Sequence, residues 1–204
     1  PPRRSLLSFE PDALEAEMTA LGLPKFRARQ LWRWVWRHGV TDFSDMTDLG
    51  KPLQALMSER FHVDRPAVSR RQDSSDGTIK WLIKLSDGQE AETVYIPDDG
   101  RGTLCISSQI GCTLTCSFCH TGTQRLVRNL NVDEICGQIL LAMDEWGGWP
   151  ATKPGRRLTN IVLMGMGEPL YNYDYVASAM RIIMSNEGVG VSKRRITLST
   201  SGIV

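Results

Sequence analysis

The sequence predicts an α/β protein in which a small helical domain and a β-hairpin precede a partial (β/α) barrel, truncated after about three strands. Apolar residues recur at helical spacing up to about residue 61, alternate with polar residues over 79–96, and then mark strands and helices in turn. Strands that alternate with helices are typical of a parallel sheet with crossover helices. The expected domains are a helical domain (1–72), a connecting β-hairpin (73–100) and the barrel half (101–204).

Three helices are expected in the helical domain, over about residues 11–21, 24–38 and 52–61. Pro11 opens the first helix and Gly22 ends it, because both residue types are boundary signals at those positions. Together the three helices predict a small bundle.

The second of these helices carries basic residues and tryptophans together. Basic side chains at every fourth position form a ridge flanked by tryptophans, which combines phosphate neutralisation with surfaces for base stacking and favours contact with structured RNA. Arginine stems that cover tryptophans on a solvated helix are the alternative. The ridge is Lys25, Arg29, Arg33 and Arg37, the flanking residues are Trp32 and Trp36, and the expected buried face is Leu31, Trp34, Val35 and His38.

The remaining elements follow in order along the chain. Residues 70–77 are expected to form a polar linker, and the period of two over 79–85 and 91–96 around a Ser-Asp-Gly turn predicts the hairpin. The chain stops after its third strand of the strand-helix alternation, so the sheet is expected to be half built. Strands are expected over 103–109, 159–165 and 195–200, and helices near 132–145 and 173–186.

Composition places the protein in a broad class. With 204 residues, 41% hydrophobic and 23% charged, and a net charge of +1, it is expected to be a soluble globular protein. No apolar run approaches the roughly 20 residues that span a bilayer, so no membrane partner is expected. Five cysteines, an odd number, without an export signal predict a cytoplasmic location.

Three cysteines form the most specific motif. Cys112, Cys116 and Cys119 are spaced C-x3-C-x2-C, and no fourth cysteine follows at ligand spacing. Three thiolates would hold three irons of a cubane cluster and leave the fourth iron open to a small molecule. A disulfide framework fits poorly because the chain is long and its cysteines are few and odd in number. Structural zinc fits poorly because the one extra ligand candidate, His120, directly follows Cys119.

A second motif ends the next predicted strand. The cysteine loop lies between a strand and a helix, which places it at the carboxyl end of the sheet, where α/β folds carry their active sites. Residues 165–169, Gly-Met-Gly-Glu-Pro, end the following strand at the same edge. Their glycines permit close backbone approach to a ligand, and Glu168 can bind an ammonium group. An ordinary Gly-rich turn is the alternative.

These motifs resemble the radical S-adenosylmethionine superfamily. Four stretches in order narrow the resemblance to the ribosomal RNA large-subunit methyltransferase N family, which methylates C2 of an adenine in 23S rRNA. The resemblance covers nearly the whole chain and implies a [4Fe-4S] cluster and S-adenosylmethionine as cofactors. The four stretches are residues 92–97, 103–130, 159–172 and 192–202.

The resemblance also implies roles for single residues. Cys105 matches a cysteine that resolves a protein-RNA adduct by forming a disulfide, and Glu92 matches the base that removes the C2 proton. The family's methyl-bearing cysteine has no counterpart here, and Cys136 does not replace it because its apolar neighbours at helical spacing predict a core position. Residues 1–204 alone are therefore expected not to complete methyl transfer. The implied cluster ligands are Cys112, Cys116 and Cys119, and the implied S-adenosylmethionine contacts are Gly167, Glu168 and Ser199.

The implied partners are 23S rRNA, in some members a tRNA, and a flavodoxin-type reductant, with the protein itself a monomer. One alternative is the sister activity that methylates C8 of the same adenine. Another is a non-catalytic RNA-binding module with structural zinc. The histidines His38, His62 and His120 are expected to pack or lie at the surface rather than bind metal.

Overall fold

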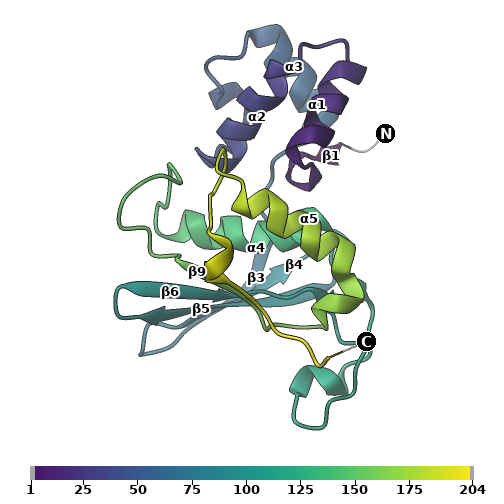
Figure 1. Cartoon of the computed structure of the whole chain (residues 1–204), viewed down its shortest axis with the longest axis vertical. Coiled ribbons are helices and arrows are strands. Elements are labelled where there is room, and N and C mark those ends of the chain that lie inside the picture. Colours follow the sequence, from purple (N-terminus) through teal and green to yellow (C-terminus); the bar gives the residue numbers. More distant parts are fainter. Residues whose placement is uncertain (1–2, 203–204) are drawn as a thin grey trace.

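The computed structural model describes residues 3–202. Figure 1 shows three layers: a bundle of short helices, a pair of longer helices beneath it, and a β-sheet with one face covered by that pair. The bundle consists of α1 (Pro11–Ala20), α2 (Phe26–Trp36) and α3 (Lys51–Arg60), as predicted. The covering pair, also predicted, consists of α4 (Val132–Glu145) and α5 (Tyr173–Met184). Within residues 3–202, every helix is too short or too polar to cross a membrane.

The sheet has six strands in the order β10-β9-β6-β5-β4-β3. Strands β6, β9 and β10 run parallel, which confirms the parallel arrangement predicted from the strand-helix alternation. The other neighbours, from β3 to β6, are antiparallel. The strands are β3 (Ala67–Asp73), β4 (Ile79–Lys84), β5 (Glu90–Asp98), β6 (Arg101–Cys105), β9 (Asn160–Leu163) and β10 (Ile196–Leu198).

The expected polar linker is wrong in its first half. Residues 70–73 belong to β3, which pairs with β4 at the edge of the sheet. Every residue of β3 is exposed, so no alternation of apolar and polar residues marks it in the sequence. The predicted hairpin is present as β4 and β5, but it continues on both sides into one sheet.

The strand expected over 103–109 is interrupted. Strand β6 pairs with β9 only as far as Cys105 opposite Val162. The chain then leaves the sheet, and Gln109–Ile110 form β7, which pairs antiparallel with β8 (Arg128–Asn129). The loop that carries the three cysteines is therefore closed at its base by a two-stranded ladder.

Short elements complete the chain. Strand β1 (Arg4–Ser5) pairs in parallel with β2 (Phe61–His62), which joins the start of the helical domain to the end of α3. Strands of two residues are too short to show a period in the sequence. The 3-10 helices are η1 (Leu6–Ser8), η2 (Phe43–Asp45), η3 (His120–Thr123), η4 (Pro169–Asn172) and η5 (Lys193–Arg195).

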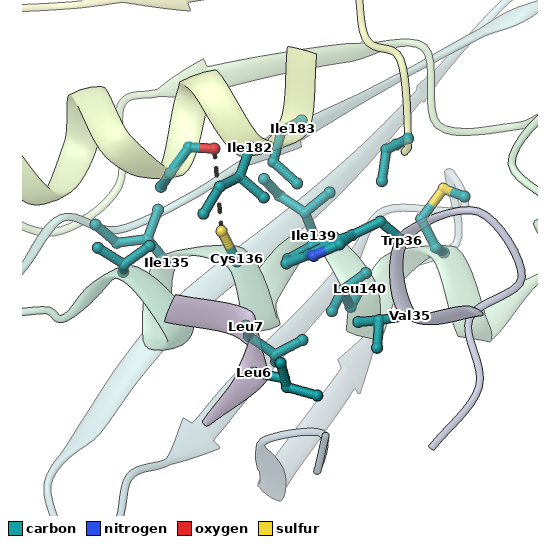
Figure 2. Close-up of a cluster of buried hydrophobic side chains, with 14 of the residues drawn as sticks. Leu6, Leu7, Val35, Trp36, Ile135, Cys136, Ile139, Leu140, Ile182 and Ile183 are labelled. Carbon is teal, nitrogen blue, oxygen red and sulfur yellow. Dashed lines mark hydrogen bonds between the residues drawn. The ribbon is translucent and has the colours of Figure 1, made fainter. Parts of the chain in front are cut away.

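One continuous core joins the helical domain to the covering helices. Cys136 is fully buried in it, which confirms the core position predicted for this thiol. Figure 2 shows its surroundings, where side chains of four elements meet. They are Ile135, Ile139 and Leu140 of α4, Ile182 and Ile183 of α5, Leu6 and Leu7 of η1, and Val35 and Trp36 of α2.

Strand side chains alternate between two faces of the sheet. The face beneath α4 and α5 is buried and includes Trp81, Leu104 and Ile161. Alternate positions, among them Glu92 and Cys105, are only partly buried and lie on the opposite face. No helix of residues 3–202 covers that opposite face, which we call the open face (Figure 1).

Candidate functional site

The carboxyl ends of β6 and β9 are joined by backbone hydrogen bonds. The amide of Gly165 donates to the carbonyl of Ile106 at 3.0 Å, and the amides of Ser108 and Gln109 both donate to Met166, at 2.9 and 3.1 Å. The cysteine loop and the Gly-Met-Gly-Glu-Pro turn therefore leave the sheet side by side, as their position after parallel strands predicts.

The two glycines of this turn are required by that close approach. Gly167 has φ of +97°, and a Cβ there would lie 2.4 Å from Cβ of Gln109. A Cβ at Gly165 would lie 2.7 Å from the carbonyl oxygen of Ile106. Any larger residue would separate the two strand ends, so the glycines already have a structural role besides any contact with a ligand.

Glu168 is 4% exposed and is held by donors of the chain itself. One carboxylate oxygen accepts from the amide of Leu170 at 3.1 Å, and the other accepts from the amide and hydroxyl of Ser201 at 2.9 and 3.2 Å. Burial raises the pKa of Glu168, but hydrogen bonds from Ser201, Thr200 and Leu170 outweigh it, so the pKa lies below its ordinary value. An ionised carboxylate has about four acceptor positions, which leaves capacity for a further donor.

The third strand end reaches this carboxylate through Ser201. Ser199, the predicted site residue of this strand end, lies just past β10 and is exposed. Ser201, two residues later in the same Ser-Thr-Ser-Gly run, makes the contact with Glu168, and the cofactor contact expected of Ser199 stays a prediction. The run of hydroxyl residues after a strand indicates that one of them contacts the site. Which of them does so depends on the path of the chain after β10.

A buried network of side chains, which the sequence pattern does not predict, supports the strand ends from the side of α4. The backbone of Ser107 donates to and accepts from the Gln138 carboxamide, at 2.8 and 3.0 Å. The Ser107 hydroxyl donates to the carbonyl of Glu92 at 2.6 Å and accepts from the amide of Met166 at 2.9 Å. Gln138 thus replaces the strand partner that β6 loses after Cys105. The sequence feature that indicates this role is the amide side chain of Gln138 on an otherwise apolar face of α4.

The cysteine loop is held by its own backbone. Cys112 donates its amide to the carbonyl of Gln124 at 3.3 Å, and Cys119 donates to Cys116 at 3.1 Å. A Cβ at Gly122 would lie 2.7 Å from the carbonyl oxygen of Cys116, so the loop folds tightly. All three thiols are free and partly exposed. The local fold therefore keeps three sulfur donors available within one compact loop.

The thiols are not arranged round one point. Within residues 3–202, no three His, Cys, Asp or Glu side chains gather as ligands of a single ion. Tetrahedral zinc needs such a gathering, whereas in a cubane each thiolate binds a different iron. Three free thiols on one loop match the donor set of a three-cysteine cluster.

On the open face, Cys105 and Glu92 lie on neighbouring strands. Cys105 ends β6 opposite Val94, two residues along β5 from Glu92. Burial raises the pKa of the Cys105 thiol, and the Glu92 charge raises it further, against a lowering hydrogen bond from the backbone of Met164. Lys80 of β4, also missed by sequence analysis, forms an ion pair with Glu92 at 3.0 Å.

The expected aromatic flank of the basic ridge is wrong. Trp32 and Trp36 are 3% and 1% exposed, and a Cβ at Gly188 would lie 2.9 Å from Cβ of Trp36. They pack against the segment after α5 and are too buried to offer the expected stacking surfaces, although Trp32 lines a pocket together with Arg29. His38, expected on the buried face, is exposed.

The exposed side of α2 carries other aromatic residues. The indole N–H of Trp34 donates to Asp48 at 2.5 Å, and its ring lies 5.1 Å from that of His38. Together with exposed Phe26 they offer stacking surfaces beside the arginines. A cavity of about 360 Å³ on this side is lined by Phe26, Arg29, Gln30, Arg33, Trp34, His38 and Asp48.

Two family models match the helical domain and the later part of the chain separately. The family model "Ribosomal RNA large subunit methyltransferase N-terminal domain" matches residues 4–63, and the model "Radical SAM superfamily" matches residues 106–204. A solved structure, a radical SAM methyltransferase from Sphaerobacter thermophilus, is similar with a TM-score of 0.88 and 40% identity, over 98% of this chain and 57% of that one.

Curated relatives are closely similar in sequence. The dual-specificity RNA methyltransferase RlmN of Rhodospirillum rubrum is 59% identical over 98% of this chain and 47% of its own length. That of Gluconobacter oxydans is 57% identical over 99% of this chain and 51% of its own. The chain therefore spans about half the length of the curated relatives that it matches. With both family models matched in order and these identities, the chain belongs to the RlmN family of radical SAM proteins.

Proposed function

We propose that this chain supplies the cluster loop and cofactor site of a radical S-adenosylmethionine enzyme that methylates RNA. The observation that carries the proposal is the meeting of three strand ends: the cysteine loop follows β6, and Glu168 after β9 accepts hydrogen bonds from Ser201 after β10. In parallel α/β sheets this edge is where ligands bind. On this proposal, β6, β9 and β10 begin a (β/α) barrel.

The cofactor residues follow from the same edge. Cys112, Cys116 and Cys119 would hold a [4Fe-4S] cluster, while Gly167, Glu168 and Ser199 would contact S-adenosylmethionine. Glu168 suits an ammonium group because it is ionised, buried and incompletely satisfied. When bound, these cofactors supply the radical chemistry that C2 of adenine requires, because that carbon is not nucleophilic.

The proposed substrate is an adenine of 23S rRNA, methylated at C2, and also a tRNA adenine, since the similar curated proteins are named dual-specificity RNA methyltransferases. Glu92 would remove the C2 proton and Cys105 would resolve the adduct. Both lie on the open face, where their side chains are partly buried. The methyl-bearing cysteine is proposed to lie beyond residues 1–204.

Other expectations remain predictions. They are the division into domains at residues 72 and 100, the flavodoxin-type reductant, the monomeric state and the cytoplasmic location. The RNA contact is now proposed for the exposed side of α2, where Arg29 and Arg33 adjoin Phe26 and Trp34.

Metal analysis after anaerobic purification tests the proposal. About four irons with matching sulfide are expected per chain. One zinc without iron would instead support the zinc-containing RNA-binding module. For the longer natural protein, mass spectrometry of digested rRNA separates 2-methyladenosine from 8-methyladenosine, and the latter product would favour the C8 sister activity.

A further inference from the structure

One row of side chains crosses the open face beneath the strand ends. The register pairs Lys80 with Val94, Val94 with Cys105, Cys105 with Val162, and Val162 with Thr197. Paired residues on adjacent strands point to the same face. Lys80 and Cys105 therefore share a row, separated by one uncharged residue, and among these five residues they alone carry or can acquire a charge.

Glu92 lies on β5 two residues from Val94, toward the edge of the sheet where the cysteine loop begins. Its cross-strand partner is Leu82, so Lys80 reaches it diagonally, with Nζ 3.0 Å from Oε1. The main chain of Glu92 is held separately, because its carbonyl accepts from the buried Ser107 hydroxyl at 2.6 Å. The backbone and the carboxylate of Glu92 are thus fixed by two different groups.

The ion pair does little for the stability of the fold. The Lys80 and Glu92 side chains are 41% and 45% exposed, and ion pairs at such positions are weak in water. Their position matters more, because the Glu92 carboxylate raises the pKa of the Cys105 thiol and Lys80 pairs with that carboxylate. An ammonium group paired with a carboxylate offsets its effect on a nearby thiolate. The thiolate is the nucleophilic form of cysteine.

We propose that Lys80 is a positioning residue: its ammonium group holds the Glu92 carboxylate on the open face and offsets the negative charge of Glu92 beside Cys105. The inference rests on the proposed roles of Glu92 and Cys105. It adds a third side chain to the open-face site and assigns it no contact with the reacting atoms. The charged groups nearest to Cys105 in this register are Glu92 of the adjacent strand β5 and Lys80 of β4, one strand further away, while β9 and β10 contribute Val162 and Thr197 to its row.

The test is the pH profile of Cys105 alkylation by iodoacetamide in the reduced chain. Tandem mass spectrometry reads Cys105 separately from the three cysteines of the loop. Lys80→Met is expected to shift the profile upward by about 0.3 to 0.5 pH unit and to slow alkylation at pH 8 roughly two- to threefold. Lys80→Arg is expected to retain the wild-type profile, and Glu92→Gln is expected to shift it downward.

Lys84→Met is the matched control. It removes the same charge from the same strand and the same face. Lys84 is also a diagonal neighbour of Glu92, but among the described residues only Lys80 forms an ion pair with that carboxylate. An unchanged profile in Lys80→Met, or an equal shift in Lys84→Met, would overturn the proposal. Should Lys80→Met fail to fold, the alkylation profile of Glu92→Gln is the test. A Glu92→Gln profile that does not move downward would overturn the proposal.

Iron content of the same preparations separates this inference from the proposed function. Chains that bind iron but show no coupling between Lys80 and Cys105 refute the role of Lys80 alone. Chains without iron refute the proposed function, whatever the alkylation profile shows.

Discussion

The two faces of the sheet are built from alternate residues of the same strands, yet they are chemically different. On the packed face, Gln138 of α4 satisfies both its own amide and the backbone of Ser107, while Cys136 of the same helix is fully buried with its thiol toward α5. On the open face, Cys105 stands partly exposed near an ion pair. The packed face determines where the strand ends lie, and the open face presents groups that can react.

Helix α2 repeats this division at smaller scale. Trp32 and Trp36 are buried against the segment after α5, whereas Phe26, Trp34 and Arg29 line an exposed cavity. In both elements the packed side contributes stability and the other side carries the proposed functional groups. Substitutions on the packed side are therefore expected to lower the stability of the fold, and substitutions on the exposed side to impair binding or chemistry.

Loss of a loop cysteine gives the largest expected effect. Cys112→Ala, Cys116→Ala and Cys119→Ala are each expected to abolish iron binding after anaerobic reconstitution, because three ligands are the minimum for the proposed cluster. Cys136→Ala is the control from the packed face: it is expected to retain iron while lowering the free energy of unfolding by about 1 kcal/mol. Full iron content in a loop variant would contradict the ligand assignment.

The second largest effect is expected from removal of the buried Gln138 amide on the packed face. Gln138→Leu leaves the N–H and C=O of Ser107 without their partners, so the free energy of unfolding is expected to fall by about 2 to 4 kcal/mol. Urea denaturation measures the loss. Gln72→Leu, an equivalent change on the exposed edge strand β3, is expected to change it by less than about 0.5 kcal/mol. Equal losses in both variants would show that Gln138 has no special role.

Charge reversal on the exposed side of α2 is expected to act on binding and not on folding. Arg29→Glu and Arg33→Glu should weaken binding of an rRNA fragment and lower the salt slope by about 1 for each phosphate that is no longer neutralised. Fluorescence anisotropy at several salt concentrations measures both. Arg60→Glu, at the end of α3 in the same domain, is the control. An equal effect of Arg60→Glu would mean that overall charge, rather than this side of α2, binds RNA.

The smallest effect is expected from the titration of Glu168. Because its pKa is lower in the folded state than its ordinary value of 4.5, its charge stabilises the fold above that pH. This contribution is lost as pH falls from about 4.5 through the folded pKa. Wild type should therefore lose stability more steeply than Glu168→Gln below this pH. Thermal melts from pH 6 to 3 check it, with exposed Glu59→Gln as the control. Parallel curves for wild type and Glu168→Gln would contradict the lowered pKa.

Local patterns in the sequence determined much of this protein by themselves. Helical spacing located α1 to α5, and the strand-helix alternation after residue 103 predicted that β6, β9 and β10 run parallel. The cysteine spacing marked the proposed cluster loop, because spacing within eight residues needs no tertiary information. Cys136 was placed in the core by its neighbours alone.

Only the tertiary structure decided which residues meet across the chain. The contacts of Ser107 with Gln138, of Glu168 with Ser201 and of Lys80 with Glu92 depend on strand order and register, which residue periodicity does not encode. The same reason explains the errors: β3 is exposed on every residue, and both faces of α2 carry tryptophan, so periodicity alone could not assign their surroundings. Sequence determined the elements and the chemistry, and packing determined the side of each element on which that chemistry lies.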